Sequence, residues 1–382
     1  MQTLQTDIAV VGAGPIGLEL AAALKRHGFD YLQFDAKQIG YTISWFAPFT
    51  RFFSSNERIA IAGVPLHTPD QGKASREQYL DYLRGVVELF DLQVNTYEPV
   101  TAIRRDGDGF ILTTNPPAGP RVCRARRVVL VTGGTDRPRR LNIPGEDLPN
   151  VSHYFQDPHP YFRKRLLIVG GKNSAVEAAL RCHHAGAHVS LSYRGTELSA
   201  QSIKYWLMPE ITGLIESGRI PAYFGTVPTK IAPTEVTLTE GSGFGGQGSG
   251  GESGSRVEGV GNKVLTPSPP SSLNPDPRTL NPLPRTIPAD FVLLLIGYAQ
   301  DNKLLRLAGV QLQGDNQGPV FDERTMETNI PGLYVAGTAV GGTQDKYRIF
   351  IENCHVHVDR IIAAFIGEKP PAAPEPIARP ET

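Results

Sequence analysis

A pattern of strand, glycine turn, helix and strand occurs twice in this chain, at the same internal spacing. The first copy runs from Gly12, after an apolar run, to Asp35, which is 23 residues further on. The second runs from Gly170 to Tyr193, again 23 residues, and begins 158 residues after the first. A glycine turn between a buried strand and a helix is typical of a βαβ unit that binds a dinucleotide. The repeat therefore predicts two dinucleotide-type units in one chain.

The first turn has the complete glycine fingerprint. Gly12 permits a tight turn, Gly14 lets the backbone approach a pyrophosphate, and Gly17 lets the helix pack against the strand. The helix N-terminus then offers free N–H groups to the phosphates. Asp35, at the end of the second strand, can accept hydrogen bonds from ribose hydroxyls. The alternative is a glycine turn that packs and binds nothing, and the complete context favours binding.

The second turn departs from the ideal pattern. Lys172 stands where the second fingerprint glycine would be, and Ala175 replaces the third. Tyr193 replaces the acidic residue, and Arg194 follows it. A carboxylate at this place would repel a ribose 2′-phosphate, whereas an arginine can pair with it. The pattern therefore favours NADPH over NADH, with an ordinary surface arginine as the alternative.

The rest of the chain alternates helical and strand patterns around one biased segment. Residues 240–288 are rich in Gly, Ser and Pro, which predicts a disordered insertion between two strands, either a tolerated surface segment or a partner-binding arm. Helices are expected at 18–26, 76–89, 175–184 and 349–365. Strands are expected at 8–11, 31–34, 94–103, 110–114, 121–123, 128–131, 166–169, 189–193, 289–298 and 332–337.

The composition excludes several classes of function. Lys+Arg and Asp+Glu balance at 38 each, so no global charge attracts nucleic acid or an anionic membrane, although Arg137, Arg139 and Arg140 form a local basic patch. Three scattered cysteines provide neither a CxxC pair nor a zinc ribbon, and no metal site is expected. No signal peptide or membrane-spanning run is visible, so we expect a cytoplasmic protein.

These motifs resemble the thioredoxin-reductase-like FAD/NAD(P) pyridine nucleotide oxidoreductases, most closely the YpdA-type bacillithiol disulfide reductases. The resemblance covers nearly the whole chain except the insertion and the tail. The segments that carry it are TRFFSS (50–55), NIPGEDLPNVSH (142–153), GGKNSAVEAAL (170–180), IKYWLMP (203–209) and IFIEN (349–353).

The resemblance implies an α/β fold of two Rossmann-type three-layer (ββα) domains, with the NADPH domain inserted into the FAD domain. We expect FAD in residues 1–152 and 303–367, NADPH in 153–302, a disordered tail at 368–382, and a homodimer. The expected FAD residues are Gly12, Gly14, Pro15, Ile16, Gly17, Asp35, Ala36, Trp45, Thr132, Gly133, Gly337, Ile349 and Phe350. The expected NADPH residues are Gly170, Gly171, Lys172, Asn173, Ser174, Ala175, Tyr193, Arg194, Ile296 and Gly297.

The implied activity is hydride transfer from NADPH to FAD and on to an external acceptor, such as a small thiol disulfide or a small redox protein. Relatives of this type often carry a cysteine, proposed to act in catalysis, where this chain has Ile16, and thioredoxin reductases proper carry a CxxC pair that is absent here. Cys354, near the predicted final helix, is the candidate substitute, with a packing role as the alternative. Cys123 and Cys182 are expected to be structural.

Three other functions remain open at the level of sequence: a ferredoxin or flavodoxin–NADP reductase, a flavin monooxygenase, and a flavin-binding redox sensor with little turnover. For any of these functions, an aromatic loop is a candidate part of the flavin site. Its members would cover the flavin, with Trp45 as the best candidate, or form the loop's own core; they are Trp45, Phe46, Phe49, Phe52 and Phe53.

Overall fold

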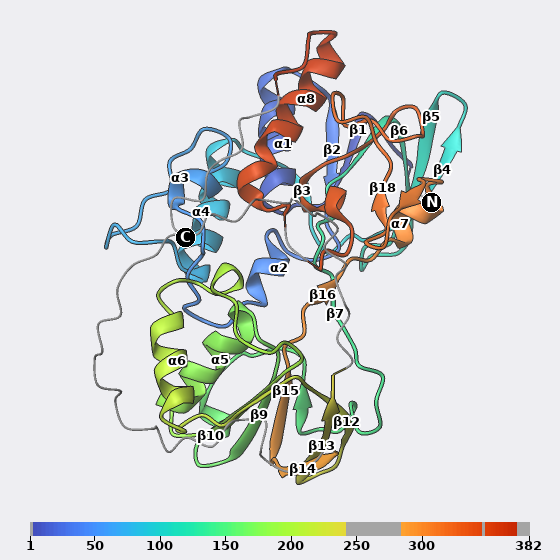
Figure 1. Ribbon diagram of the computed structural model, residues 1–382. Helices are drawn as coiled ribbons and strands as arrows, with labels where there is room; N and C mark the ends of the chain where they lie inside the picture. Colours follow the sequence, from blue (N-terminus) through green and yellow to red (C-terminus); the bar gives the residue numbers. More distant parts are fainter. Residues whose placement is uncertain (1–2, 242–283, 346–347, 373–382) are drawn as a thin grey trace, which may run out of the picture.

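The computed structural model describes residues 3–241, 284–345 and 348–372, and within these ranges the chain forms two lobes (Figure 1). We call the part built on strand β1 the first lobe and the part built on strand β9 the second lobe. None of the helices in the described ranges is long and apolar enough to cross a membrane.

The first lobe is built on a mixed sheet whose described strands run in the order β3-β2-β1-β6-β5-β4, with β19 also paired to β6. The strands β1, β2, β3, β6 and β19 are parallel to one another, and β5 runs antiparallel to its neighbours β4 and β6. Their bounds are β1 Thr3–Val11, β2 Tyr31–Phe34, β3 Val94–Asn95, β4 Val100–Asp106, β5 Gly109–Thr114, β6 Arg121–Leu130 and β19 Leu333–Val335.

Alternation along β1 explains the layers of this lobe, because successive side chains of a strand point to opposite faces. Ile8 and Val10 pack in one cluster with residues of α1 (Pro15–Arg26) and α8 (His355–Ile366). Ala9 and Val11 pack on the other face with β4 and β5. The sheet therefore lies between a helical layer and a β layer.

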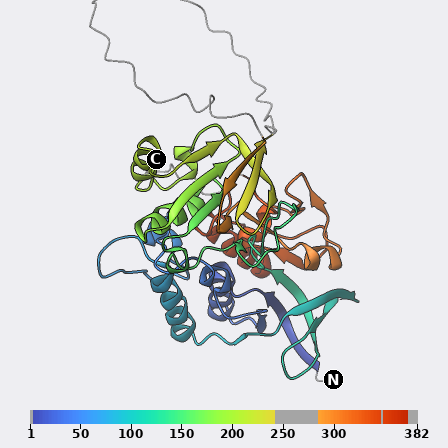
Figure 2. The ribbon, with the colours of Figure 1, turned by 90° about the horizontal axis from the view of Figure 1, so that it is seen from below.

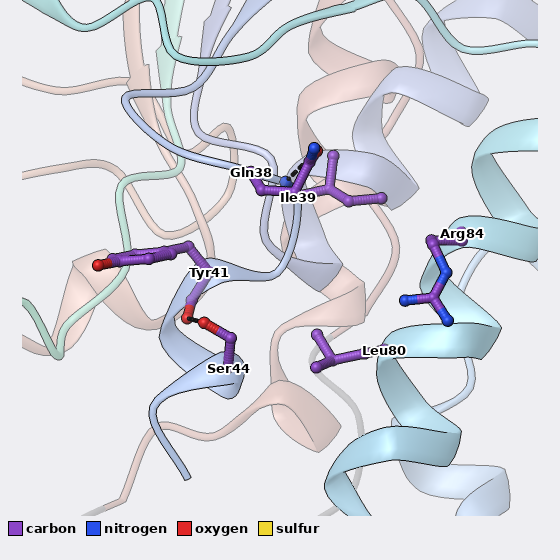
Figure 3. A pocket seen from close by; sticks show the side chains of 6 residues that line it. All are labelled: Gln38, Ile39, Tyr41, Ser44, Leu80 and Arg84. Carbon is purple, nitrogen blue, oxygen red and sulfur yellow. Dashed lines mark hydrogen bonds between the residues drawn. The ribbon is translucent and has the colours of Figure 1, made fainter.

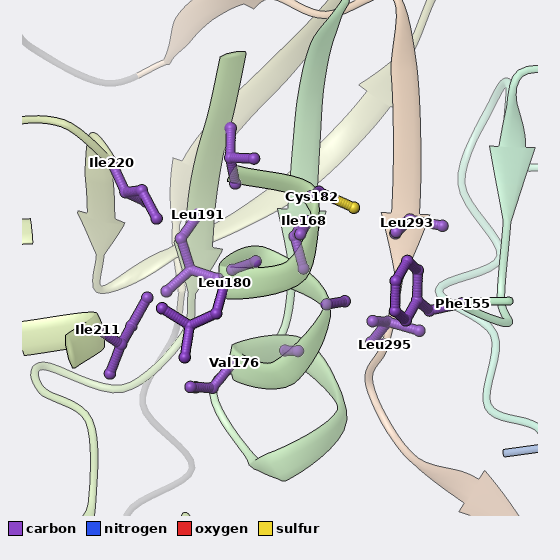
Figure 4. Close-up of a cluster of buried hydrophobic side chains, with 14 of the residues drawn as sticks. Phe155, Ile168, Val176, Leu180, Cys182, Leu191, Ile211, Ile220, Leu293 and Leu295 are labelled. Atoms are coloured by element: carbon purple, nitrogen blue, oxygen red, sulfur yellow. The ribbon is translucent and has the colours of Figure 1, made fainter. Parts of the chain in front are cut away.

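The second lobe has a parallel sheet in the order β11-β10-β9-β15-β8, as far as the chain is described. Its central strand β9 is apolar on both faces: Leu166 and Ile168 pack against α5 and α6, while Leu167 and Val169 pack against the antiparallel strands β12–β14 (Figures 1, 2 and 4). The bounds are β8 Val151–Ser152, β9 Arg165–Val169, α5 Asn173–His184, β10 His188–Tyr193, α6 Met208–Glu216, β11 Ala222–Phe224, β12 Thr226–Ile231, β13 Glu235–Glu240, β14 Arg285–Pro288 and β15 Phe291–Leu294.

The chain passes between the lobes along two short strands. β7 (Arg137–Pro138) pairs antiparallel with β16 (Tyr298–Ala299), and both lie between the lobes (Figure 1). Because β6 and β19 share the first sheet on either side of this excursion, the second lobe is inserted into the first. The predicted fold class, two Rossmann-type units with one inserted into the other, is confirmed. The remaining elements are α2 Tyr41–Ser44, α3 Asn56–Ile59, α4 Arg76–Leu89, α7 Lys303–Leu307, β17 Leu312–Gln313, β18 Gly318–Pro319 and the 3-10 turns 159–161, 200–202, 337–341 and 351–353.

Several predicted elements differ from the structure. The strands expected at 121–123 and 128–131 are one strand, β6, whose first half pairs with β5 and second half with β19. The strand expected at 94–103 is two strands, β3 and β4, at opposite edges of the sheet. Residues 285–288, predicted as part of the disordered insertion, form β14 against β13. The insertion's residues 242–283 and the tail's residues 373–382 lie outside the described ranges.

Candidate functional site

The first glycine turn has the shape of a dinucleotide cradle. Gly12 has a φ of +117°, and a Cβ there would overlap the carbonyl group of Val131. A Cβ on Gly17 would overlap the carbonyl oxygen of Gly12, which explains the close approach of helix to strand. Around Gly14, by contrast, no described atom lies within 4 Å of an added Cβ, so that face of the turn is open. The N-terminus of α1, with Pro15 at its first turn, has no side-chain cap, and such an end is suited to a pyrophosphate.

Asp35 lies beside this turn at the end of β2. One carboxylate oxygen accepts a hydrogen bond from the backbone N–H of Ala13 at 2.7 Å, and the other accepts from the N–H of Lys37 at 2.8 Å. Burial raises the pKa of the carboxyl group above its ordinary value. Since each carboxylate oxygen can accept more than one hydrogen bond, Asp35 can hold the turn and still accept from ribose hydroxyls.

Gln33 supports the same turn and escaped the sequence analysis. Its side chain is fully buried in β2, and its Nε2 donates to the carbonyl of Gly12 at 2.9 Å. Asn95 of β3 in turn donates to the backbone carbonyl of Gln33 at 3.0 Å. The only signal in the sequence was a polar amide inside a short parallel strand, where a buried polar group needs a partner.

Gln300 performs a similar task on the opposite edge of the first lobe. Its Nε2 donates to the carbonyl of Gly133, after β6, and to the carbonyl of Ala339, after β19, at 3.2 and 3.0 Å. Its Oε1 is buried and has no hydrogen-bond partner within the described part of the chain. The two strand ends with predicted FAD residues, at Gly133 and Gly337, are thus joined through one buried side chain, which sequence analysis did not identify.

Ile16 and Cys354 belong to the same apolar cluster, between α1 and the start of α8. Ile16 is 4% exposed, and a Cβ on Gly337 would lie 3.4 Å from its Cβ. Cys354 is fully buried, and burial raises the pKa of its thiol far above the usual range. Such a thiol is protonated at neutral pH and is not a nucleophile, so the structure does not support Cys354 as a catalytic residue.

The final helix begins later than predicted. Residues 349–354 are not α-helical: Ile351–Asn353 form a 3-10 turn, and α8 begins at His355. The side chain of Asn353 explains the delay, because it accepts from the N–H of Phe350 at 2.8 Å and donates to the carbonyl of Arg348 at 2.7 Å. Cys354 therefore immediately precedes the helix rather than lying five residues along it.

The other two cysteines are buried as well. Burial raises the pKa of Cys123 to about 11 and that of Cys182 to about 12. Figure 4 shows Cys182 at the end of α5 among the apolar side chains of the second lobe. Both have the structural role that was expected of them.

The aromatic loop divides between several environments. Trp45 lies at the boundary of the lobes, edge-to-face with Tyr154 and tilted against Tyr298, with ring centroids 5.7 and 6.2 Å apart. Phe52 packs against Tyr79 in the core of the first lobe. The other three side chains have different surroundings. Phe53 stacks on Trp206 of the second lobe, whereas Phe46 is 37% exposed and Phe49 is 77% exposed. The loop therefore joins the lobes, and a contact of Trp45 with FAD stays a prediction.

His357 supports the turn at Gly337 from α8. The side chain is 7% exposed, and its Nδ1 accepts a hydrogen bond from the N–H of Gly337 at 3.2 Å. Burial, with the nearby charges of Arg360 and His355, lowers the pKa of His357 to about 4. The imidazole is therefore neutral at physiological pH, as an acceptor must be.

This burial predicts a pH dependence of stability. Between pH 6.5, the ordinary histidine value, and about pH 4, the unfolded chain binds a proton at His357 and the folded chain does not. The contribution of His357 to the free energy of unfolding therefore falls as the pH falls through this window, by roughly 3 kcal/mol in all.

The measurement is the difference between the wild type and His357→Gln, which keeps an acceptor but does not titrate. The difference is needed because Asp136, whose pKa burial raises to about 6, acts in the opposite direction in the same window. We expect acid to destabilise the wild type more than the variant in chemical denaturation at pH 7, 5.5 and 4.5. Parallel pH profiles would contradict the assignment.

The second glycine turn is also closely packed. Gly170 has a φ of +140°, and an added Cβ would overlap the carbonyl oxygen of Leu295. A Cβ on Gly171 would lie 2.5 Å from the ring of Tyr193, so the ring covers the backbone of the turn. The Oδ1 of Asn173 accepts from the N–H of Lys204 at 2.6 Å. Ala175 is buried, while Lys172 and Ser174 are exposed on the turn.

The lobes touch beside the second turn. The Nζ of Lys172 donates to the backbone carbonyl of Asp345 in the first lobe at 2.7 Å. The Oγ1 of Thr50 donates to Glu177 of α5 at 2.9 Å, and the Nζ of Lys204 donates to the carbonyl of Arg51 at 2.8 Å. In this orientation the second turn faces the segment that precedes the predicted FAD residues Ile349 and Phe350.

A small pocket lies next to the Asp35 loop, between α2 and α4 (Figure 3). Its volume is about 250 Å³, below the range of cavities that hold a drug-sized ligand. It is therefore too small to be the dinucleotide site. The lining residues are Gln38, Ile39, Tyr41, Ser44, Leu80 and Arg84.

Comparison with known proteins gives consistent matches over most of the chain. The sequence profile of the pyridine nucleotide-disulphide oxidoreductase family matches residues 9–243. Bacilliredoxin reductase Bdr of Bacillus subtilis (strain 168) is 33% identical over 361 residues, which cover 94% of this chain and 97% of that protein. A ferredoxin–NADP reductase of Ignicoccus hospitalis is 25% identical over 336 residues, covering 87% of this chain and 89% of its own. The solved structure of bacillithiol disulfide reductase Bdr (YpdA) from Bacillus cereus has a TM-score of 0.80 and 32% identity, and the match covers 95% of this chain and 99% of that chain.

Proposed function

Since the chain belongs to the pyridine nucleotide-disulphide oxidoreductase family and is an FAD-dependent NADPH oxidoreductase of the disulfide reductase type, we propose that its electron acceptor is the disulfide of a low-molecular-weight thiol. The observation that carries this proposal is the similarity, over more than nine-tenths of the chain, to a bacilliredoxin reductase and to a bacillithiol disulfide reductase. The lower identity to ferredoxin–NADP reductases makes that function the less favoured one.

The overall reaction is the conversion of NADPH, a proton and one disulfide into NADP⁺ and two thiols. When bound, NADPH supplies a hydride and FAD passes the two electrons to the acceptor. The protein's part is to bind and orient. We assign the FAD to the first turn, where the open face at Gly14 admits a pyrophosphate and Asp35 lies within reach of a ribose.

We assign NADPH to the second turn, with Arg194 as the partner of the ribose 2′-phosphate. The support is the position of Arg194 directly after β10, at the place where an acidic residue would select NADH. In this assignment the FAD domain comprises residues 1–152 and 303–367 and the NADPH domain residues 153–302. β8 at 151–152 belongs to the sheet of the second lobe, because it pairs with β15. We therefore propose that the structural boundary between the two domains lies at β7 and β16 instead.

A homodimer also remains a proposal, derived from the family resemblance. The chain has a mass of 41.5 kDa, so light scattering coupled to gel filtration distinguishes a monomer from a dimer.

We further propose that no thiol of this chain takes part in the reduction. Each of the three cysteines is free and buried, and burial raises the pKa of each thiol. A protonated thiol in an apolar core neither attacks a disulfide nor meets an external one. Bound FAD would therefore reduce the acceptor without a protein thiol between them.

A cysteine-free variant tests this proposal. We expect Cys123→Ala/Cys182→Ala/Cys354→Ala to reduce bacillithiol disulfide with a kcat/KM within about twofold of the wild type, because it loses packing but no reacting group. The control is the anaerobic rate of flavin reduction by NADPH, measured in the same protein. A variant that keeps flavin reduction but loses disulfide reduction would show that a cysteine is needed.

A further inference from the structure

Asp345, an exposed residue of the first lobe, is held by a cation that belongs to neither glycine turn. The Nη1 of Arg139 donates to its carboxylate. Arg139 lies directly after β7, on the connection between the lobes, and its guanidinium is fixed by further bonds to the carbonyls of Tyr298 and Gln344 at 3.1 and 3.3 Å. The Asp345 side chain is 72% exposed, whereas that of Arg139 is only 27% exposed. The guanidinium of Arg139 is therefore fixed by several hydrogen bonds, whereas the Asp345 carboxylate that it binds is largely exposed to solvent.

Two cations of the second lobe approach the same residue. Lys172, on the second glycine turn, donates from Nζ to the backbone carbonyl of Asp345 at 2.7 Å. The pKa of the Asp345 carboxyl is lowered first by its hydrogen bond with Arg139, and in addition by the charges of Lys172 and of Arg194, which directly follows β10. Arg139 thus binds the carboxylate of Asp345, Lys172 binds its backbone carbonyl, and Arg194 adds a favourable charge.

A carboxylate in such a position has the charge and the acceptor oxygens of a phosphate group, and arginine binds either in the same way. These three cations include Lys172 and Arg194, the two residues that our assignment places nearest to the phosphates of NADPH. We propose that Asp345 occupies part of the phosphate-binding site formed by Arg139, Lys172 and Arg194, and that a phosphate of the nicotinamide dinucleotide displaces it on binding. This inference rests on the proposed function of the second turn.

The proposal assigns one more residue to nucleotide recognition, and it predicts that nucleotide binding affects a segment of the first lobe. Arg139 becomes a phosphate-binding residue outside the second βαβ unit. Displacement of Asp345 also releases a segment that is connected to the flavin side, because the neighbouring Gln344 accepts from the N–H groups of Arg348 and Ile349 at 2.8 and 2.9 Å. Nucleotide binding in one lobe is thereby coupled to the segment that leads into the predicted FAD residues of the other.

The test is a set of NADP⁺ binding isotherms measured by calorimetry on the FAD-containing protein, a readout that does not depend on turnover. Asp345→Asn removes the competing charge, and we expect NADP⁺ to bind about three- to tenfold more tightly, as an exposed ion pair and one like-charge repulsion allow. Arg139→Gln removes a phosphate partner, and we expect binding to weaken roughly tenfold. In the Arg139→Gln background, Asp345→Asn should have a smaller effect than in the wild type.

The matched control is Asp315→Asn, which makes the same change of charge at an exposed residue of the first lobe. It should leave the affinity unchanged, which separates competition at the site from a change of net charge. An affinity gain of Asp345→Asn for both NADP⁺ and NAD⁺ would place the pyrophosphate in the site, and a gain for NADP⁺ alone would place the 2′-phosphate there.

An unchanged or weakened affinity of Asp345→Asn would overturn the inference, because Asp345 would then not compete with the nucleotide. Failure of the proposed function gives a different result. In that case the wild-type protein itself shows no binding of NADP⁺, and the inference fails together with the function on which it rests.

Discussion

Replacing Gly14 by valine should weaken FAD binding on the order of 100-fold while leaving the fold of the FAD-free protein intact. No described atom lies within 4 Å of a Cβ at this position, and Gly14 has an ordinary extended backbone with φ of −73°, so the folded chain tolerates the substitution. The added side chain instead occupies the face on which the pyrophosphate meets the helix N-terminus. Loss of two charge-assisted hydrogen bonds there, each worth about 1.5 kcal/mol, corresponds to an FAD affinity weaker on the order of 100-fold.

The measurement is the FAD content of the purified variant, together with a titration of the FAD-free protein by flavin fluorescence. Gly85→Val is the matched control, since Gly85 is exposed on α4 and also has open space around its added Cβ. We expect the control to retain FAD. A Gly14→Val protein with normal FAD content would show that the first turn does not bind the pyrophosphate.

Removing the carboxylate of Glu177 should produce the largest loss of stability among single changes at the boundary of the lobes. Lys204 is only 6% exposed, and its Nζ lies 2.8 Å from Glu177 Oε2. Glu177→Leu leaves this ammonium buried without its counter-ion, which costs about 3–5 kcal/mol. The same change breaks the bond from Thr50, so the contact between the lobes weakens as well.

Differential scanning calorimetry measures the effect, because a two-lobed chain need not unfold in a single step. The double variant Glu177→Leu/Lys204→Met is the informative control: with both charges removed, most of the lost stability should return. Arg84→Ala, which breaks the exposed pair of Arg84 with Asp81, should cost less than about 1 kcal/mol. Equal effects of Glu177→Leu and Arg84→Ala would show that the Lys204 pair is not buried in solution.

Local signals were sufficient to predict the elements that position the two turns. The helix at Arg76–Leu89 has the predicted bounds because Ser75 and Gln78 form a capping box, which marks a helix start in the sequence itself. The two βαβ units were predictable from glycine spacing, because the strand, turn and helix that require the glycines form one short stretch of sequence. The atoms that exclude a side chain at Gly12 and Gly170 nevertheless belong to the distant residues Val131 and Leu295. The parallel strand β9 is apolar on both faces and reads as a continuous run.

Features that depend on a single side-chain hydrogen bond or on distant partners were not predictable. The late start of α8 is caused by Asn353, whose amide competes with the helix, and no pattern of apolar residues reveals this. Gln300 joins Gly133 and Ala339, which are more than 160 and nearly 40 residues away from it in the sequence. The burial of Cys354 likewise follows from the packing of α8 against α1, so the sequence alone left its role open.

The residues predicted to bind the cofactors depend partly on local signals and partly on distant partners. The structure places Gly12 and Gly170 in tight turns at the end of a strand, and it brings Lys172 into contact with Asp345. The direct contacts of all these residues with a cofactor stay predictions.

The most direct test of the account is an anaerobic titration of the purified protein with NADPH, followed by flavin absorbance, and then the addition of bacillithiol disulfide. The account predicts that NADPH bleaches the flavin absorbance and that the disulfide restores it at a rate that supports turnover, in the cysteine-free variant as in the wild type. Bleaching that the disulfide does not reverse would contradict the proposed acceptor. A flavin that NADPH does not bleach at all would contradict hydride transfer between the two lobes.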